Sequence, residues 1–427
     1  MRLELMSEFD YEQALDYLAT FSKQGAPITD LSRFSALCGE LGNPEKGLRC
    51  IHIVGTNGKG SVTEYISAAL CACGFRTIRF TSPYILDVRE RITLDGEFIP
   101  KDVFARLIFE VKSAAECCRD RAFSQFEILT AVCFLFARES GADYCVLEAG
   151  IGGTLDCTNV IPCPEAAVFT SIGLDHTAIL GKTEREIAVS KSGIIKGGAV
   201  IAANNIPAEA MAVIEGKCSE THSRLVVPDA KALEVRESGL CGSRFIYKGE
   251  EYSLSMCGNH QITNALTALE TLFALREKLP LDRVKAALKT AVMPARLERI
   301  NLPEKPAIIL DGGHNPQAMA AARELLMRDK RKKTALIGMI NTKDFALALS
   351  IILPCFDFAV FYDGFSETAV SAELLCAEAK RVGTPCAGCH SAEEALSEAI
   401  SRTPDSGLLF IGGSFYMAAG IREMLLG

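Results

Sequence analysis

Residues 51–61 read IHIVGTNGKGS, and this stretch decides the fold that we expect. Residues 51–54 form a short run rich in β-branched side chains, which predicts a strand. The glycine-rich segment 55–61 follows directly, and the small and apolar residues after it predict a helix that ends at Gly74. A strand, a glycine-rich turn, a lysine, a serine and a helix in this order are typical of a phosphate-binding loop.

The chemistry of residues 55–61 suits a phosphate. Glycines let the backbone approach the anion, while amide groups and the helix N-terminus supply positive potential. Lys59 would neutralise terminal phosphates, and the hydroxyl of Ser61 would face a metal ion or a phosphate. The spacer is shorter than in the Walker pattern, and Gly60 separates the lysine from the serine. We predict phosphate binding here; the alternative is a glycine-rich turn without a ligand.

Short β-branched runs alternate with amphipathic helical stretches from residue 51 to the end of the chain, which is typical of an α/β fold with parallel sheets between helices. The first series of predicted strands covers residues 51–54, 77–80, 144–147, 166–169 and 199–202. The second covers residues 307–310, 335–338, 358–361 and 408–411. Between them, residues 230–256 predict a hairpin or small meander that elaborates the first domain.

A short connection with two prolines, residues 301–306, follows an amphipathic helix and suits an interdomain link. We therefore place the domain boundary near residue 297. Residues 1–296 are predicted to form a P-loop domain with a mostly parallel sheet, and residues 297–427 a smaller, Rossmann-like α/β domain. Two domains agree with a length of 427 residues.

The composition is that of a globular protein, with 49% hydrophobic and 23% charged residues. Forty-five basic and 53 acidic residues give a net charge of -8, so no overall basic field attracts nucleic acid or anionic lipid. Trp is absent, which disfavours a protein that stacks bases. No apolar run approaches the ~20 residues that cross a bilayer, and the first residues carry charge. We expect a soluble, cytoplasmic protein without a nucleic-acid or membrane partner.

Seventeen cysteines do not indicate a disulfide framework, because a chain of this length can build its own core. Most are expected to be reduced and buried. The segment CAGCH at residues 386–390 matches a haem-attachment pattern and half of a zinc site. We expect neither function, because a second cysteine pair is missing and so many cysteines produce such spacings by chance.

Polar residues follow several predicted strands of the first domain. Ser82 follows the second strand, Glu148 ends the third, and Asp175 and His176 come shortly after the fourth. In open parallel sheets, ligands bind beyond the carboxyl ends of the strands. A hydroxyl, a carboxylate and an imidazole there suit a hard divalent ion beside phosphates. Taken singly, each has a plainer interpretation as a turn residue, an ion-pair member or a helix cap.

Lys191 lies on the apolar face of a predicted helix, four residues after Ile187 and three before Ile194. A lysine at this position points inward, and burial lowers the pKa of an amine. A neutral amine can take up carbon dioxide to become a carbamate, which is an anionic oxygen ligand for a metal. The pattern alone favours the alternative, a snorkelling or ion-paired lysine.

In the second domain, the strand ending at residue 310 leads into DGGHNP at residues 311–316. Pro316 opens a helix, so Asp311 and His314 lie at the carboxyl end of a strand, where they could face the first domain. A turn with a helix cap is the alternative. Arg296, at the presumed hinge, is either a surface charge or a ligand for a phosphate.

These residues together resemble folylpolyglutamate synthase and the bifunctional dihydrofolate synthase/folylpolyglutamate synthase, relatives of the Mur ligases. The resemblance covers nearly the whole chain, and the ordered set of motifs is highly specific. The motifs are GTNGKGS at 55–61, TSP at 81–83 with RERI at 89–92, LEAG at 147–150 with GG at 152–153, LDCTN at 155–159, DH at 175–176 with LG at 180–181, KSGI at 191–194, GNHQ at 258–261 with NA at 264–265, RLE at 296–298 and DGGHNP at 311–316.

The resemblance implies the Mur ligase architecture and an ATP-dependent amide ligase that adds L-glutamate to folates through an acyl phosphate, with dihydropteroate as a second candidate substrate. It implies a monomer that uses Mg²⁺ and small-molecule substrates, with carbamylated Lys191. The residues with an implied catalytic role are Lys59, His176, Lys191, Asp311 and His314. Those on the nucleotide are Gly55, Asn57, Gly58, Lys59, Gly60, Ser61, Asn264, Arg296 and Asp311. The metal ligands are Ser82, Glu148, His176 and Lys191. The pterin contacts are Thr29, Asp30, Leu31, Ser124, Gln125, Phe126, Glu127, Leu155, Asp156 and Cys157.

Four positions depart from the family pattern. Tyr84 replaces a histidine, Thr154 an arginine, Ser190 a glutamate and Ala295 a glycine. The first two lie on the pterin side of the expected site, while the phosphate and metal residues are intact. The alternative functions are another Mur-type amide ligase acting on a nucleotide-linked precursor, or a P-loop protein that binds nucleotide without catalysis.

Overall fold

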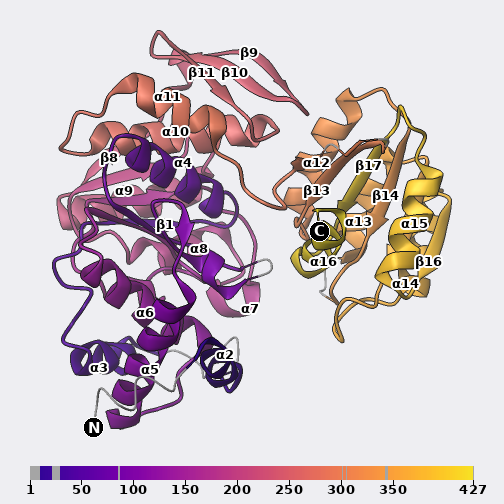
Figure 1. Ribbon diagram of the computed structural model, residues 1–427. Helices are drawn as coiled ribbons and strands as arrows, with labels where there is room; N and C mark the ends of the chain where they lie inside the picture. The colour runs from indigo at the N-terminus through magenta and orange to yellow at the C-terminus, as the bar shows by residue number, and fades with distance from the viewer. Residues whose placement is uncertain are drawn as a thin grey trace. The chain divides into compact units, whose positions relative to one another are not determined.

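The computed structural model describes residues 10–21, 29–84, 87–300, 302–303, 305–341 and 345–426. It divides the chain into two compact units (Figure 1). The first unit comprises Met1–Lys231 and Thr263–Leu288, and the second comprises Ala232–Ile262 and Lys289–Gly427. Among the helices in these described ranges, none is both long enough and apolar enough to span a bilayer.

The first unit is built on an eight-stranded sheet, counted over the described residues, with the order β4-β3-β2-β5-β1-β6-β7-β8. The strands from β2 to β8 in this order pair in parallel, whereas β3 and β4 are antiparallel. All five strands predicted for the first series are confirmed. The bounds are β1 Cys50–Val54, β2 Thr77–Phe80, β3 Ile92–Leu94, β4 Glu97–Phe98, β5 Tyr144–Glu148, β6 Ala166–Phe169, β7 Ala199–Ala202 and β8 Arg224–Val226.

Helices cover both faces of this sheet, which is why every residue of β1, β5, β6 and β7 is buried. Figure 1 shows α4 on one face, and α5 and α6 on the other. The capping box between Ser124 and Glu127 fixes where α6 begins. The helices that lie wholly or partly in this unit are α2 Tyr11–Ala19, α3 Ser32–Glu40, α4 Lys59–Ala72, α5 Lys101–Cys117, α6 Gln125–Glu139, α7 Thr177–Leu180, α8 Glu184–Ser192, α9 Ala208–Thr221, α10 Asn259–Ala274 and α11 Leu281–Thr290.

The second unit contains a three-stranded antiparallel sheet, β9 Leu233–Gly239, β10 Gly242–Tyr247 and β11 Glu250–Leu254. The predicted meander is therefore confirmed. Sequence analysis assigns it to the first domain, but the structure groups it with the second unit. The local turn pattern specified the strands, but it carried no information about which core they join.

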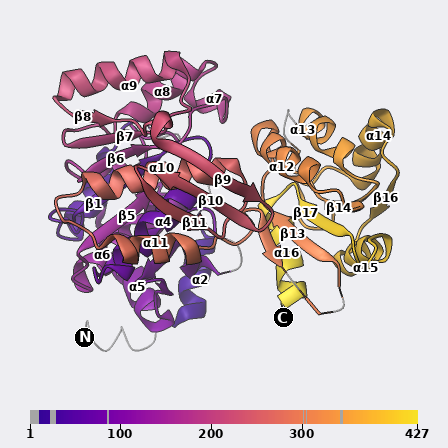
Figure 2. The same cartoon turned by 90° about the horizontal axis from the view of Figure 1, so that it is seen from above.

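A six-stranded sheet forms the core of the second unit over its described residues, in the order β12-β13-β17-β14-β15-β16. All four predicted strands are confirmed. Figure 2 shows α12, α13 and α14 on one side of this sheet, and α15 and α16 on the other. The bounds are β12 Glu298–Ile300, β13 Ala307–Asp311, β14 Lys333–Ile337, β15 Phe358–Tyr362, β16 Cys386–Cys389, β17 Leu408–Gly412, α12 Pro316–Arg328, α13 Phe345–Ile352, α14 Ala372–Val382, α15 Ala392–Arg402 and α16 Phe415–Leu426.

Side chains of the central strands point alternately to the two helical layers. Ile309, Ala335 and Phe410 belong to one apolar cluster with Leu325 of α12 and Leu375 of α14. Their neighbours along the strands face the other layer, as a period of two requires. This two-sided burial leaves the strand ends as the places where polar residues reach the surface, so the candidate site lies there. The mixed α/β architecture agrees with the predicted fold class.

Candidate active site

The glycine-rich loop connects the end of β1 to the start of α4. Gly58 has φ +85° and directly precedes the first residue of α4. A Cβ atom on Gly58 would lie 2.5 Å from Oδ1 of Asn264 in α10. Glycine is therefore required both by the backbone conformation and by the close approach of Asn264. The structure brings together these two residues, which sequence analysis places on the nucleotide from separate motifs.

Residues after β6 hold the loop in place. The Thr170 hydroxyl donates to the carbonyl oxygen of Asn57 at 2.6 Å, and the backbone N–H of Asn57 donates to Oγ of Ser171 at 2.9 Å. The hydroxyl of Thr56 donates to the carbonyl oxygen of Gly173 at 3.0 Å. Sequence analysis missed these supports. The signal was present, because Thr170 and Ser171 are polar residues directly after a buried parallel strand.

Two lysines from different elements meet at the loop. Nζ of Lys59 donates to the carbonyl oxygen of Gly55 at 3.1 Å, and Nζ of Lys191 donates to the same oxygen at 3.1 Å. Lys191 is 3% exposed, as its place on the apolar face of α8 predicts. Burial and the neighbouring charge of Lys59 lower the pKa of Lys191 to about 7. A substantial fraction of this amine is therefore uncharged near neutral pH.

Three of the four predicted metal ligands follow strands or end them, and the fourth, Lys191, lies in α8. Glu148, the last residue of β5, is 2% exposed, and its Oε2 accepts the backbone N–H of Ser82 at 3.2 Å. His176 is exposed at the start of α7, and its backbone N–H donates to Oδ1 of Asp175. No cluster of three or more His, Cys, Asp or Glu within the described ranges is arranged to hold a metal ion.

Ser124 and Glu127, two of the predicted pterin contacts, also have a structural role. The Ser124 backbone N–H and hydroxyl both donate to Oε2 of Glu127 at 2.8 Å. Arg33 of α3 contacts both oxygens of Glu127 at 3.0 to 3.1 Å. Glu127 is only 2% exposed, so this two-oxygen ion pair is what makes its burial tolerable. Gln125 begins α6 beside them.

A second group of predicted pterin contacts gathers around Gly150. A Cβ atom on Gly150 would lie 3.0 Å from the ring of Phe126 and 3.3 Å from Oδ2 of Asp156. Asp156 is 5% exposed, and Cys157 is 2% exposed beside the hydroxyl of Thr130. Leu155 is 42% exposed. Two segments that are distant in the sequence, residues 126–130 and 150–157, therefore converge here.

The N-terminal pterin motif, residues 29–31, directly precedes α3. Thr29 and Asp30 are exposed, and Leu31 directly precedes α3. Oδ1 of Asp30 accepts the backbone N–H of Ser32 at 2.7 Å, and its hydrogen bonds with Ser32 lower the pKa of the carboxyl group. These contacts begin a helix, so the structure supplies a local role for Asp30 and leaves its pterin role a prediction.

Three of the departures from the family pattern have visible partners. The Thr154 hydroxyl donates to the backbone carbonyl oxygen of Ser190 at 2.8 Å, which links two departures directly. The ring of Tyr84 lies 5.3 Å from the guanidinium group of Arg91, which also lies 5.8 Å from the ring of Phe126. Arg91 therefore connects Tyr84 to a predicted pterin contact through cation–π interactions.

The second unit holds its own polar cluster at the end of β13. Asp311 is 7% exposed, and burial raises its pKa to about 6, against the opposing effect of the Arg296 charge. The Arg296 guanidinium lies 4.3 Å from the centre of the Phe415 ring. His314 is half-buried in the turn before α12. Ala295, the fourth departure, has φ +53°, a conformation that glycine adopts more easily.

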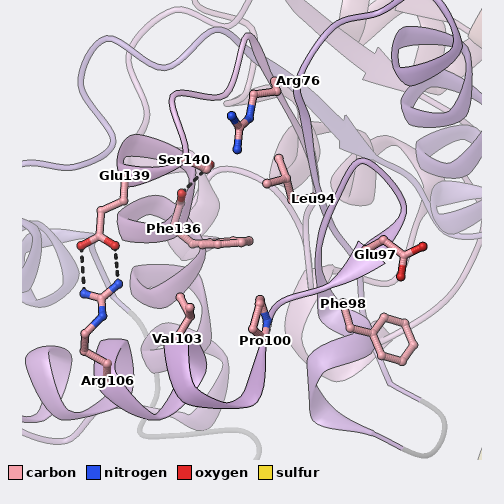
Figure 3. Close-up of a pocket in the computed structure, with 10 residues that line it drawn as sticks. All are labelled: Arg76, Leu94, Glu97, Phe98, Pro100, Val103, Arg106, Phe136, Glu139 and Ser140. Atoms are coloured by element: carbon pink, nitrogen blue, oxygen red, sulfur yellow. Dashed lines mark hydrogen bonds and ion pairs between the residues drawn. The ribbon is translucent and has the colours of Figure 1, made fainter.

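A pocket of about 370 Å³ lies in the first unit (Figure 3). It is at the end of the sheet opposite the glycine-rich loop and Glu148. Arg76 directly precedes β2, and Glu139 and Ser140 end α6 shortly before β5 begins, so the pocket lies at the amino ends of these parallel strands. Arg106 and Glu139 form an ion pair on its wall. The pocket contains none of the predicted site residues. Residues 386–389, from the CAGCH segment, form the strand β16, and His390 pairs with Asp363.

Comparison with known proteins identifies the family to which this chain belongs. Residues 53–272 match the Mur ligase middle domain, and residues 295–415 match the glutamate ligase domain of Mur ligases. The first match covers more than half of the chain. The chain therefore belongs to the Mur ligase family and is an ATP-dependent amide ligase.

Within that family, the chain belongs with the folylpolyglutamate synthases. It is 31% identical to folylpolyglutamate synthase of Lacticaseibacillus casei, over 98% of this chain and 99% of that protein. It is also 31% identical to dihydrofolate synthase/folylpolyglutamate synthase of Bacillus subtilis, over 92% and 94% of the two chains. The structure of Mycobacterium tuberculosis folylpolyglutamate synthase complexed with ADP and AMPPCP superimposes with a TM-score of 0.87 at 28% identity, covering 98% of this chain and 99% of that one.

Proposed function

We propose that this chain is an ATP-dependent ligase that adds L-glutamate to folates, at the carboxyl ends of β1, β5 and β6. The observation that carries the proposal is the full-length similarity to folylpolyglutamate synthases. The loop geometry around Gly58 and Lys59 supports it, because backbone amides, a helix N-terminus and a lysine converge where phosphates would bind. The bifunctional Bacillus subtilis relative adds a second candidate reaction, the ligation of glutamate to dihydropteroate.

The reaction needs an activated acid, because a carboxylate is a poor electrophile at neutral pH. The folate carboxylate attacks the γ-phosphorus of ATP, the bond to the bridging oxygen breaks, and ADP leaves. Lys59 and the amides of the loop offset the charge of the transferring phosphoryl group. The amine of glutamate then attacks the acyl carbon, phosphate leaves, and the amine gives up a proton as the amide forms.

We assign the two steps to different parts of the chain. Residues 1–296 would bind ATP and the pterin, with Asn264 on the nucleotide, and residues 297–427 would bind glutamate. Asp311 and His314 supply an acid and an imidazole for the amine and its proton, while Arg296 supplies a charge for phosphate. The match of residues 295–415 to a glutamate ligase domain supports this division. We place the enzyme in the cytoplasm as a monomer.

The residues at the strand ends fit a magnesium ion. Buried Glu148 offers an anionic oxygen, Ser82 lies beside it, and His176 comes after β6, which β1 separates from β5. Lys191 completes the set when its amine bonds to carbon dioxide and releases a proton, because the carbamate is anionic. Magnesium bound there would offset charge on the phosphates. Burial of Lys191 and its position against the loop support the modification.

The pterin would lie against the Phe126 ring near Asp156, with the other contacts from residues 29–31, 124–127 and 155–157. A pterin presents adjacent N–H donors, and a buried carboxylate is a natural acceptor for them. Oδ1 of Asp156 accepts the backbone N–H of Thr158, and Oδ2 accepts that of Ile151, which fixes the orientation of the carboxylate before a ligand binds.

The test of this function is an assay that offers tetrahydrofolate and dihydropteroate separately, each with glutamate, ATP and magnesium. We expect release of ADP that depends on both the folate and glutamate, together with a product one glutamate heavier. Activity with dihydropteroate would add the second reaction. ATP hydrolysis without an amino acid would favour a non-catalytic switch, and activity with a nucleotide-linked wall precursor would favour another Mur-type ligase.

The role of Lys191 is tested by Lys191→Arg, which keeps a cation but cannot form the carbamate. We expect turnover to fall by about 10³-fold, the scale on which one electrostatic group contributes to a transition state, while the affinity for ATP changes little. Mass spectrometry of the native protein should show 44 added mass units, about that of carbon dioxide. Full activity of the variant would exclude the carbamate.

A further inference from the structure

His52 occupies the middle of β1, with isoleucine on either side. It is fully buried, and its Nε2 lies 2.8 Å from Oγ1 of Thr158 in the 3₁₀ turn η2, Cys157–Val160. Thr158 is also fully buried. A polar side chain at the centre of an apolar strand costs free energy unless it is paired, so the hydrogen bond to Thr158 offsets part of the cost of burying His52.

The hydroxyl of Thr158 connects His52 to the predicted pterin site. It donates to Oδ1 of Asp156 at 2.5 Å, and the backbone N–H of Thr158 donates to the same oxygen at 3.0 Å. The backbone N–H of Ile151 donates to Oδ2 at 3.0 Å. Three donors therefore fix the plane of this carboxylate, and one of them is itself held by His52.

The hydrogen bonds determine which nitrogen of His52 carries the proton. A hydroxyl has one proton, and the Thr158 hydroxyl gives it to Asp156. Nε2 of His52 must therefore donate, which makes Nδ1 the bare nitrogen. Nδ1 is buried and has no hydrogen-bond partner among the described residues. Burial, with a smaller effect of Lys196, lowers the pKa of His52 to about 3, so the ring stays neutral with one proton.

The turn that carries Thr158 is also fastened at its other end. Nζ of Lys196 donates to the carbonyl oxygens of Asn159 and Ile161, both at 2.6 Å. The backbone of η2 is thus held independently of His52. Loss of the His52 contact should therefore change the direction of the Thr158 hydroxyl without releasing the turn.

We propose that His52 and Thr158 are positioning residues that aim the Asp156 carboxylate at the pterin ring. The inference rests on the proposed function, in which Asp156 accepts hydrogen bonds from the pterin. Each carboxylate oxygen can accept two hydrogen bonds. Oδ1 already accepts two and Oδ2 accepts one from Ile151, so the remaining acceptor site for the ligand is on Oδ2. If the Thr158 proton turned toward His52, Oδ1 would lose a donor and the carboxylate could rotate.

Two pairs of variants test this chain of contacts. Thr158→Val removes the hydroxyl at nearly constant volume, and Thr158→Ser restores it. His52→Gln can place an amide N–H near the Nε2 position, while His52→Asn is too short to reach it. We expect Thr158→Val and His52→Asn to raise KM for the folate about 10-fold, the scale of one hydrogen bond to a charged group. KM for ATP should stay unchanged, and the Ser and Gln variants should recover most of the affinity.

Thr271→Val is the control for a lost core hydroxyl. Thr271 is also fully buried, and its hydroxyl donates only within α10, to the carbonyl oxygen of Thr267 at 2.8 Å. The Thr271→Val variant should lower the melting temperature of the protein as much as Thr158→Val does, but its KM for the folate should not change. Equal rises in KM for folate and ATP in Thr158→Val, or no rescue by serine, would show a merely structural role and overturn the proposal.

Asp156→Asn separates failure of this inference from failure of the proposed function. If Asp156→Asn weakens folate binding, measured by titration calorimetry, but Thr158→Val and His52→Asn do not, the positioning role is wrong and the pterin contact stands. If Asp156→Asn binds the folate as tightly as the native protein, the pterin contact itself is wrong, and the positioning role falls with it.

Discussion

The turn after β1 and the turn after β13 both lead from a buried parallel strand into a helix, but they carry opposite charge. The first holds two lysines, Lys59 and Lys191, on a single carbonyl oxygen. The second places a buried carboxylate, Asp311, at the last position of its strand. Both use glycines to bring backbone close to other groups: a Cβ on Gly313 would lie 2.8 Å from Ala318, as one on Gly58 would crowd Asn264.

The difference shows that the strand-turn-helix arrangement of the backbone determines where a ligand binds, while the side chains determine which charge the ligand must carry. Strand ends and helix N-termini provide space and amide donors in both units. Lys59 at the first turn makes it suitable for phosphates. A carboxylate whose pKa is raised by burial makes the second suitable for a cationic or hydrogen-bonding group, such as the amine of an amino acid. The following variants test this contrast.

Lys59→Met should have the largest effect, because it removes the charge nearest the transferring phosphoryl group while keeping the length of the side chain. We expect kcat to fall about 10³-fold, which corresponds to about 4 kcal/mol. The measurement is the rate of ADP release at saturating ATP, folate and glutamate.

Lys217→Met is the control, because Lys217 lies on the surface of α9 and pairs with Glu220. It should retain full activity. A Lys59→Met enzyme with more than a tenth of the native kcat would mean that the loop amides alone provide the positive potential, and the contrast in charge between the two turns would lose its significance for catalysis.

Asp311→Asn should change how stability depends on pH. The folded pKa is raised to about 6, above the usual value of 3.8. The folded state therefore binds more protons than the unfolded state between these values, and stability falls as pH rises through the window. The group is expected to cost up to about 3 kcal/mol above pH 6 and nothing below pH 4. Urea unfolding from pH 4 to 7 should show this loss in the native protein and not in Asp311→Asn.

Asp329→Asn is a control in which the stability should depend on pH in the opposite direction. Its hydrogen bonds with Arg331 lower the pKa of Asp329, so its contribution is present at neutral pH and is lost as pH falls through the folded pKa. The difference between native protein and Asp329→Asn should therefore shrink toward low pH. If both variants shift the unfolding midpoint in the same direction with pH, the pKa of Asp311 is not raised.

The sequence was sufficient to predict the central strands and missed several edge strands. Central parallel strands are buried on both faces, so they appear as continuous β-branched runs such as residues 51–54. Edge strands are short and partly exposed, and residues 224–226 and 386–389 carry no such run. The rule that ligands bind beyond the carboxyl ends of parallel strands located Ser82, Glu148 and Asp311. It needs only the position of a residue in the sequence relative to a predicted strand.

Contacts between distant segments could not be predicted. His52 and Thr158 are 106 positions apart, and their hydrogen bond depends on how η2 folds over β1. Histidine inside an apolar strand was a visible anomaly, but nothing in the sequence named its partner. The same holds for Arg33 and Glu127, whose ion pair joins two helices. The family resemblance supplied site residues that local pattern could not, and their individual roles stay predictions.

Gly58→Ala should have the smallest effect and isolates the crowding at the first turn. A residue with φ +85° costs about 1 kcal/mol of stability when it carries a Cβ, and here the Cβ would also displace the Asn264 side chain. Gly96→Ala is the matched control, because Gly96 has φ +88° with no atom within 4 Å of the added Cβ. Both variants should lose similar stability in urea, but only Gly58→Ala should raise KM for ATP, by about 10-fold or 1.4 kcal/mol. An unchanged KM for ATP would mean that Asn264 can move aside without loss, and that it does not bind the nucleotide.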